Sequence, residues 1–148
     1  MPNTVFVYGE TGSEDGGQFD PHKTHQNGLS VDFMVPVLDA AGDSVPLPTS
    51  MLNKWGYDLE FDDSGRLDDL RIDYAAISEH LYQLHRAAND AGVGIWRVIF
   101  DPNLQPHLHA TKRWAYLVKN MEFSTKRSWV RHDEHYHVDF KLECEPAA

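Results

Sequence analysis

Two histidine-rich segments lie near opposite ends of the 148-residue chain, and they constrain its fold more than any other feature. The first runs from His22 to Asp32 with the sequence HKTHQNGLSVD, and the second is HDEHYH over residues 132–137. Side chains two residues apart on a strand point to the same face, so His135 and His137 are expected to project together. If both segments bind one ion, they must fold into adjacent parts of the molecule.

The first segment offers His25 and Asp32 as partners for that pair. Residues 29–38 alternate as a strand, and Asp32 lies on the face opposite the apolar residues of the strand. A carboxylate in that position needs a polar partner or a metal ion. His25 lies seven residues earlier, across a turn that Gly28 makes easy. Two imidazoles and one carboxylate, with a fourth position open, are the composition of a catalytic rather than a structural zinc site.

The remaining pattern indicates one α+β domain over residues 1–148, in which a small antiparallel sheet carries the zinc site and helices flank it. The clearest element is a helix after Asp73, a suitable N-cap, because apolar residues recur there at steps of three and four. The expected elements are strands at 29–38, 57–61, 67–72, 95–100 and 130–142 and helices at 74–91 and 106–122.

Charge and cysteine content exclude several classes of protein. The chain has 13 basic and 23 acidic residues, a formal net charge of −10, whereas nucleic acid and anionic lipid reward clustered lysine and arginine. No apolar run approaches the roughly 18 residues of a membrane span. A single cysteine, Cys144, excludes an internal disulfide and a cysteine-rich zinc knuckle. The first residues lack the basic and apolar regions of a signal peptide.

The sequence around the two histidine segments resembles one family of zinc peptidases. HKTHQNGLSVDF and RHDEHYHVDF are similar to the motifs G-H-x-S-H-Q-x-G-L-D-V-D and H-D-D-H-F-H-V of the penicillin-insensitive murein endopeptidases, a family grouped with lysostaphin, D-Ala-D-Ala dipeptidases and hedgehog domains. Thr24, Ser30 and Glu134 replace the family's Ser, Asp and Asp, and none of them is an expected ligand position. The resemblance extends loosely over residues 16–140, but segment 43–72 has no counterpart in it.

The resemblance implies that His25, Asp32 and His137 hold Zn²⁺ and that His135 is the general base. Zinc lowers the pKa of a bound water to about 7 and polarises the carbonyl under attack. A neighbouring imidazole then accepts the proton of the water and returns it to the leaving amine.

Three further side chains complete the expected site. The resemblance implies that His132 and His22 line it and bind the substrate or the developing oxyanion. Trp129, just before the second histidine segment, is expected to border the substrate groove.

His80 and His85 lie five residues apart on the predicted helix, which is not a metal-binding spacing, and both are expected to be solvated.

The expected activity is zinc-dependent hydrolysis of an amide bond in peptidoglycan peptides, specifically the cross-link between D-Ala and diaminopimelate. Three alternatives remain open on the same residues: a D,D-carboxypeptidase, an L-Ala–D-Glu peptidase, and a zinc-bearing cell-wall-binding module without catalysis. A non-haem iron oxygenase also uses two histidines and one carboxylate. It ranks last, because its carboxylate normally stands two residues from a histidine.

Such an enzyme acts in the periplasm or cell wall. Because the chain opens without an export signal, it is expected either to be a mature fragment or to travel by another route. Delivery by a secretion machine as an antibacterial effector, with an immunity protein as partner, is one expectation. Release by a phage holin is the other.

Overall fold

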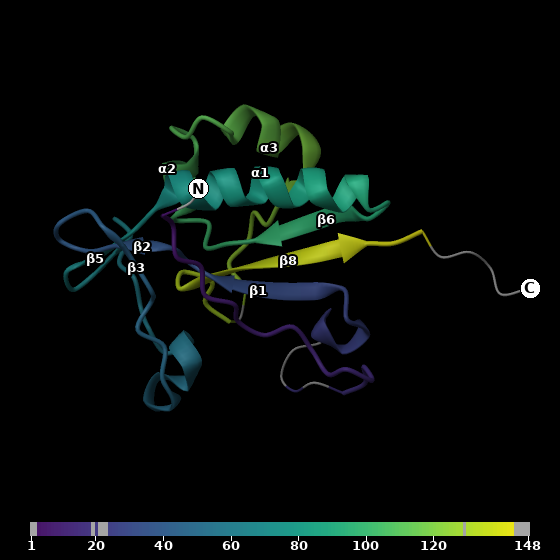
Figure 1. The fold of residues 1–148 in the computed structure, drawn as a ribbon, viewed down its shortest axis with the longest axis horizontal. Helices are drawn as coiled ribbons and strands as arrows, with labels where there is room; N and C mark the ends of the chain where they lie inside the picture. Colours follow the sequence, from purple (N-terminus) through teal and green to yellow (C-terminus); the bar gives the residue numbers. More distant parts are fainter. Residues whose placement is uncertain (1–2, 19, 21–23, 129, 144–148) are drawn as a thin grey trace, which may run out of the picture.

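The computed structural model describes residues 3–18, 20, 24–128 and 130–143, and it shows an α+β fold with two four-stranded sheets (Figure 1). The first sheet has the strand order β1-β8-β6-β7, formed by β1 (Ser30–Met34), β6 (Gly94–Ile99), β7 (Glu122–Phe123) and β8 (His135–Lys141). The second has the order β3-β2-β5-β4, formed by β2 (Val37–Leu38), β3 (Ser44–Val45), β4 (Arg66–Leu67) and β5 (Leu70–Ile72). The helices are α1 (Tyr74–Asp90), α2 (Gln105–Leu108) and α3 (Trp114–Asn120), with 3-10 helices η1 (Thr24–Asn27) and η2 (Met51–Gly56).

The pairing of β1 with β8 brings the two histidine segments together. The strands are antiparallel, and their register places Asp32 opposite His137 and Ser30 opposite Asp139. β8 also pairs antiparallel with β6, so the expected antiparallel sheet is confirmed for three strands. β7 runs parallel to β6 because the chain returns through α2 and α3, and parallel neighbours need such a crossover.

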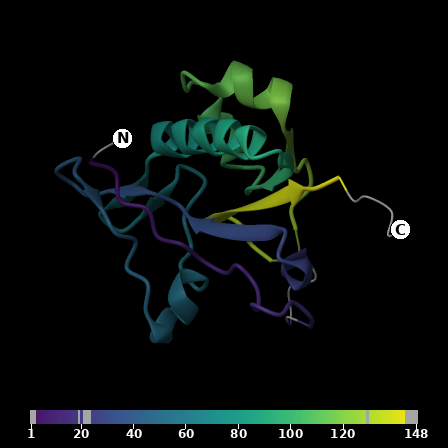
Figure 2. The same cartoon turned by 45° about the vertical axis from the view of Figure 1, so that its right-hand side comes forward.

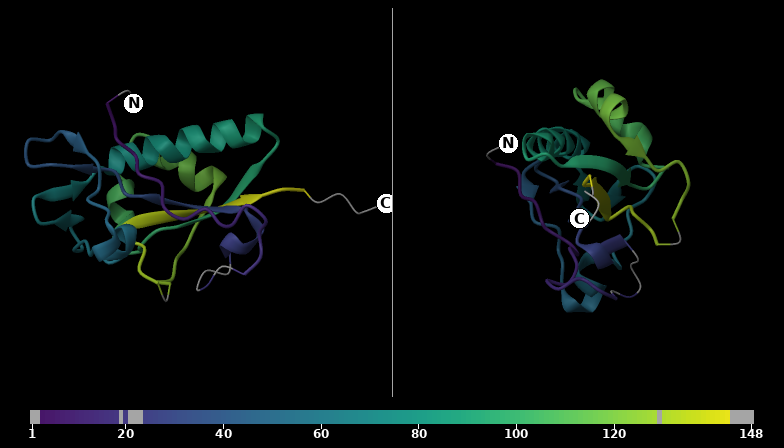
Figure 3. Two further views of the ribbon diagram at one scale, coloured as in Figure 1. Left: turned by 60° about the horizontal axis from the view of Figure 1, so that its bottom comes forward. Right: turned by 90° about the vertical axis from the view of Figure 1, so that its right-hand side faces the viewer.

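Helices cover one face of this sheet and the metal-ligand candidates lie on the other. Tyr136 and Val138 alternate with the histidines of β8, and both are fully buried in the core with Leu81 of α1. The end-on view of Figure 3 shows α1 and α3 on one side of the first sheet and the two 3-10 helices on the opposite side. Figure 2 shows the same separation from another angle.

The helix α1 confirms the sequence prediction almost to the residue. The carboxylate of Asp73 accepts a hydrogen bond from the amide of Ala76 at 2.9 Å, which satisfies one of the free donors of the first turn. The helix ends before Gly92, which has a φ of 74° that favours glycine. Within the described residues, no helix combines the length and apolar character needed to cross a bilayer.

His80 and His85 pack against aromatic side chains, so the expectation that they are solvated is wrong. His80 Nδ1 lies 2.7 Å from the hydroxyl of Tyr136, and its ring contacts Phe33 in an edge-on arrangement. His85 is 8% exposed and lies 2.9 Å from the hydroxyl of Tyr116. Burial lowers the pKa of His80 to about 4, so this imidazole is neutral at pH 7.

Several other predicted elements differ from the structure. The predicted strand 29–38 is divided into β1 and β2, the predicted strand 67–72 is a hairpin of β4 and β5, and the predicted strand 130–142 begins only at His135. The predicted helix 106–122 is divided into α2 and α3, and the amide and the hydroxyl of Thr111 both donate to the carbonyl of Leu108 where the first helix ends.

The predicted strand 57–61 is not a strand. The amides of Tyr57 and Leu59 donate to the carbonyls of Lys54 and Gly56 at 3.3 and 3.0 Å, so the turn of η2 continues into this segment. The carboxamide oxygen of Asn53 accepts from the amides of Ser50 and Gly56 and holds η2 itself closed.

Candidate metal centre

Three buried side chains converge on the open face of the first sheet. His25 lies on η1, Asp32 in the middle of β1 and His137 on β8. The His25 Nε2 atom lies 3.2 Å from His137 Nδ1 and 3.3 Å from Asp32 Oδ1, and the last two atoms are 2.8 Å apart. Atoms bound to one tetrahedral ion at about 2.0–2.1 Å lie roughly 3.3 Å from one another. The three predicted ligands therefore form a group that can hold a metal ion.

The electrostatics of this group suit a cation. Burial raises the pKa of Asp32, but hydrogen bonds with His137 and His25 outweigh it and hold the pKa well below its usual range. Burial lowers the pKa of His137, but hydrogen bonds with Asp139 and Asp32 outweigh that effect and raise the pKa to about 9. In the metal-free protein at pH 7, His137 is therefore an imidazolium between two carboxylates. A metal ion bound to Nδ1 would take the place of one proton.

Asp139 orients the imidazole of His137, a role that the sequence analysis did not assign to any residue. Its Oδ1 atom lies 2.7 Å from His137 Nε2 and accepts a second hydrogen bond of 2.7 Å from the Ser30 hydroxyl. Arg97 donates to the other carboxylate oxygen of Asp139, with Nε at 2.9 Å. With Nε2–H directed at Asp139, the Nδ1 lone pair of His137 is directed toward His25 and Asp32. A carboxylate that fixes a ligating histidine in this way is the usual second shell of a metal site.

Tyr57 fixes the other oxygen of Asp32. Its hydroxyl donates to Asp32 Oδ2 at 2.8 Å and accepts from the amide of Glu10 at 3.0 Å. Burial, followed by the charge of Asp32, raises the pKa of Tyr57 well above its usual value, so the hydroxyl stays a donor. Oδ1 is thereby left to face the two histidines. No sequence pattern predicted this role of Tyr57.

The N-terminal segment 7–10 packs along the outer edge of β1 beside these residues. The Gly9 amide donates to the Asp32 carbonyl at 2.8 Å, and the Asp32 amide donates to the Glu10 carbonyl at the same distance. A Cβ atom at position 9 would lie 2.8 Å from the Tyr57 hydroxyl and 2.9 Å from Asp32 Cβ. Glycine is therefore required here, because the chain passes so close to the candidate ligand.

His135 lies beside the three ligand candidates, as the pattern of alternate residues predicted. It is 1% exposed, and its Nε2 atom lies 3.7 Å from Asp32 Oδ2. Its Nδ1 atom lies 2.9 Å from Glu134 Oε1. Burial lowers the pKa of His135 to about 4 and raises the pKa of Glu134 to about 9, so the environment disfavours charge on both partners. An ionised Glu134 accepts a hydrogen bond from Nδ1–H of His135. Nε2 is then the basic atom of the imidazole.

His132 forms the next layer of the site. Its ring centroid lies 4.5 Å from that of His135 and 6.4 Å from that of His137. Its Nδ1 atom lies 2.8 Å from the carbonyl oxygen of Val130, so this nitrogen carries the proton and Nε2 is the acceptor in the neutral ring. Burial, with a contribution from the neighbouring His135, lowers the pKa of His132 to about 4. His22 and Trp129, the two expected substrate contacts, lie outside the described residues.

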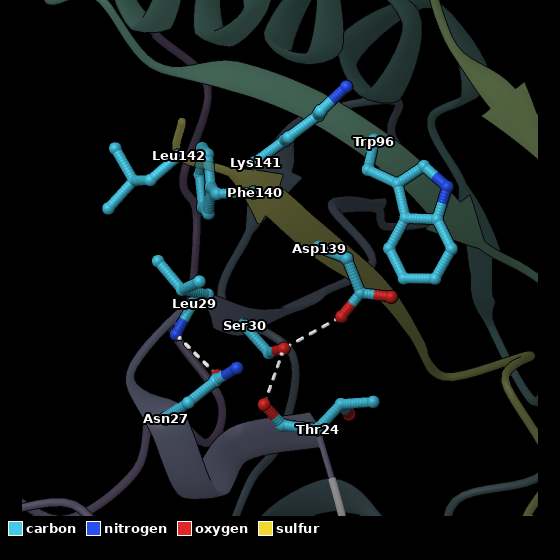
Figure 4. A pocket seen from close by; sticks show the side chains of 9 residues that line it. All are labelled: Thr24, Asn27, Leu29, Ser30, Trp96, Asp139, Phe140, Lys141 and Leu142. Carbon is cyan, nitrogen blue, oxygen red and sulfur yellow. Dashed lines mark hydrogen bonds between the residues drawn. The ribbon is translucent and has the colours of Figure 1, made fainter. Parts of the chain in front are cut away.

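A pocket of about 260 Å³ adjoins the carboxylate that orients His137 (Figure 4). In the close-up, Ser30 bridges Asp139 and the backbone carbonyl of Thr24, and the half-exposed indole of Trp96 stands on the other side of Asp139. Asp139 is thus both a partner of a candidate ligand and a part of a pocket wall.

Comparison with family models, with curated proteins and with solved structures finds no match for this chain. The function is therefore inferred from the geometry of the site and from the motifs of the two histidine segments.

Proposed function

We propose that this protein is a zinc-dependent peptidase that hydrolyses amide bonds in peptidoglycan peptides, specifically the cross-link between D-Ala and diaminopimelate. The substrate and the bond come from the resemblance of the two histidine segments to the murein endopeptidases. The observation that carries the proposal is the convergence of His25 and Asp32 with His137, which lies more than 100 residues further along the chain, with His135 beside them.

The composition of the donor set favours zinc. Two imidazole nitrogens and one carboxylate oxygen are typical of catalytic zinc sites, which keep one coordination position for water or substrate. The ion supplies a bound water of lowered pKa and polarises the scissile carbonyl. Asp139 and Tyr57 hold the ligands His137 and Asp32 in one orientation each.

The proposed reaction requires Glu134 to be ionised and His135 Nδ1–H to donate to it, because only then can His135 Nε2 accept a proton from the attacking water. The same imidazole then delivers the proton to the amine that leaves. His132 lies one ring further out, and we assign it to the substrate or to the developing oxyanion. In that second role its Nε2 atom must gain a proton, because its Nδ1–H is directed at a carbonyl.

Purified cross-linked muropeptides test the proposal directly. Zinc-loaded protein should convert cross-linked dimers to monomers, and a chelator should abolish the conversion until zinc is restored. The products, separated by mass spectrometry, also decide between the alternatives. Loss of a single D-Ala would identify a carboxypeptidase, and cleavage between L-Ala and D-Glu the other peptidase. Unchanged muropeptides, with sacculi retained in a pull-down, would identify a wall-binding module.

The substrate places this activity in the periplasm or cell wall, and we propose that the protein acts there on a competing or host bacterium. Expression of the chain fused to a periplasmic export signal should lyse the cell, whereas cytoplasmic expression should not. The His135→Ala variant is the matched control. Survival of cells with wild-type protein in the periplasm would refute this role. A neighbouring gene whose product suppresses lysis would identify the immunity partner.

A further inference from the structure

A second pocket, of about 290 Å³, lies between the N-terminal segment and η2. We call it the aromatic pocket, because Tyr8, Trp55 and Tyr57 line it together with Glu10 and Thr49. Tyr8 is 69% exposed and Trp55 is 63% exposed, so two large aromatic surfaces face solvent at its mouth. Thr49, Trp55 and Tyr57 of this pocket belong to residues 43–72, the part of the chain that has no counterpart in the murein endopeptidase motifs.

The backbone presents Trp55 in a conformation that costs energy. Lys54 and Trp55 have φ values of 48° and 61°, in the left-handed region that side chains other than glycine adopt at a cost of roughly 1–2 kcal/mol per residue. The Trp55 amide donates to the carbonyl of Ser50 at 2.7 Å, and the turn of Asn53 holds the segment closed. The surrounding bonds therefore hold an exposed tryptophan in a strained backbone conformation. Strained residues of this kind cluster at ligand-binding sites.

The aromatic pocket contains one acidic side chain. Among the described residues that line it, Glu10 carries the only formal charge. The nearest cation on η2, Lys54, is paired with Asp58 at 2.8 Å. Three aromatic rings with one carboxylate are the chemistry that binds a substituted or primary ammonium group, because each ring face attracts a cation.

The aromatic pocket is continuous with the candidate metal centre through Tyr57. This ring lines the pocket, its hydroxyl bonds Asp32, and its centroid lies 5.0 Å from that of His135. A ligand group in the pocket is therefore separated from the reacting centre by one aromatic ring. A substrate held at the metal would extend a neighbouring side chain toward Trp55.

We propose that the aromatic pocket binds a primary ammonium group of the substrate, carried by the diamino acid that precedes the D-Ala of the cleaved bond, because the side-chain amine of the other diamino acid forms that bond. This inference rests on the proposed peptidase function for the identity of the substrate. The binding chemistry itself, an amine between Trp55, Tyr8 and the carboxylate of Glu10, depends only on the described pocket.

Direct binding tests the pocket without catalysis. The probes are N-acetyl-lysine amide, which has a free ε-amine, and the same compound acetylated on that amine, titrated into zinc-loaded protein and followed by amide NMR shifts. We expect the free amine to shift resonances around Trp55 and Glu10 with at least a fivefold lower Kd than the acetylated probe. Trp55→Ala should weaken binding by about 2- to 30-fold, the range for a cation over an aromatic face. Leu52→Ala is the matched control, since Leu52 lies on the same helix, is 97% exposed and does not line the pocket.

Equal binding of the two probes, or equal effects of the two substitutions, would overturn the proposal. So would stronger shifts around Trp55 with amine-free glycan strands than with the amine, because the pocket would then be a saccharide site. Glu10→Gln, with an unchanged thermal midpoint, should reduce the preference for the free amine, and an unchanged preference would remove the carboxylate from the proposal.

Hydrolysis separates this inference from the proposed function. Wild-type protein should show a higher KM for muropeptide dimers whose free amine is acetylated, with kcat little changed, and Trp55→Ala should remove the difference. If no muropeptide is cleaved but the amine still binds at Trp55, the proposed function fails and the assignment of the pocket stands. If both dimers are cleaved with the same KM, the enzyme is confirmed and the pocket assignment fails.

Discussion

Replacement of Asp139 should weaken zinc binding although this residue is not a ligand. Its carboxylate lies 2.7 Å from His137 Nε2 and is the partner that leaves the Nδ1 lone pair facing the ion. Asp139→Ala removes the acceptor altogether. Asp139→Asn keeps an amide oxygen that can still accept the Nε2 proton, but it removes the negative charge. The two substitutions therefore separate orientation of the ring from its basicity.

The expected size of the effect follows from this one bond. A hydrogen bond to a charged group contributes about 1.5–3 kcal/mol, and at about 1.4 kcal/mol per tenfold this equals roughly 10- to 150-fold in Kd. Loss of the outer partner of a ligating histidine typically costs 10- to 100-fold, in about the same range. We expect about 100-fold weaker binding for Asp139→Ala and about 10-fold for Asp139→Asn.

The loss of zinc affinity caused by replacing Asp139 should grow as the pH rises from 7 to 9. Asp139 also stabilises the proton that competes with zinc, because it raises the pKa of His137, which reaches about 9. At pH 7, the wild-type protein must release this proton, whereas the variants hold it less strongly. Proton competition at pH 7 therefore hides part of the loss that the substitution causes.

Zinc titrations in competition with a chromophoric chelator, at both pH values, measure these differences. Asp133→Asn is the matched control, because Asp133 is a buried carboxylate bonded to Arg131 as Asp139 is to Arg97, but its other bond goes to the amide of Phe61. It should lower stability and leave the zinc Kd unchanged. A folded Asp139→Ala protein with wild-type zinc affinity at pH 9 would refute the orienting role.

Five further outcomes are expected. Zinc binding at pH 7 should release about one proton, from His137, which calorimetry in buffers of different ionisation enthalpy detects. The protonation of His137 should contribute most to the stability of the metal-free protein below pH 6.5, because the pKa of His137 is higher in the folded than in the unfolded state. As the pH rises through about 9, the free energy of unfolding should fall by at most about 3 kcal/mol. A free energy of unfolding that does not change with pH in denaturant titrations would contradict this expectation. Tyr57→Phe should weaken zinc binding about 2- to 10-fold by freeing one oxygen of Asp32, an effect absent if the hydroxyl merely fills space. His135→Ala should reduce muropeptide hydrolysis about 10²- to 10⁴-fold with zinc stoichiometry retained, and Asp73→Ala should cost about 1 kcal/mol of unfolding free energy through the lost N-cap.

Asp32 and His137 were predictable from local signals, whereas the choice of His25 rather than His135 as the third ligand came from the resemblance to the zinc peptidase motifs. The alternation of β8 places His135 and His137 on one face, and Asp32 is a charged residue on a strand whose other face is apolar. The same alternation continues to Asp139, two residues further on, and it could have identified the partner of His137. Only the register of β1 against β8, which no short pattern determines, establishes that these faces coincide.

Tyr57 was not predictable as a partner of Asp32, because its position depends on tertiary structure. The turn of η2 is held by side-chain bonds of Asn53, and backbone bonds from the amides of Tyr57 and Leu59 continue it into the segment that the apolar residues of 57–61 suggested as a strand. At the break between α2 and α3, the amide and the hydroxyl of Thr111 both donate to the carbonyl of Leu108. Both turns depend on bonds that hydrophobic periodicity does not show.

The candidate metal site joins parts of the chain that are synthesised far apart in time. His137 meets Asp32 across 105 residues and His25 across 112. An ion held by all three closes about three quarters of the polypeptide into one loop, and the last strand must be in place before the ion has its full set of donors. Because β8 lies between β1 and β6, a growing or truncated chain that lacks it would have neither the complete first sheet nor the ligand His137, so the sheet and the metal site are completed in the same step.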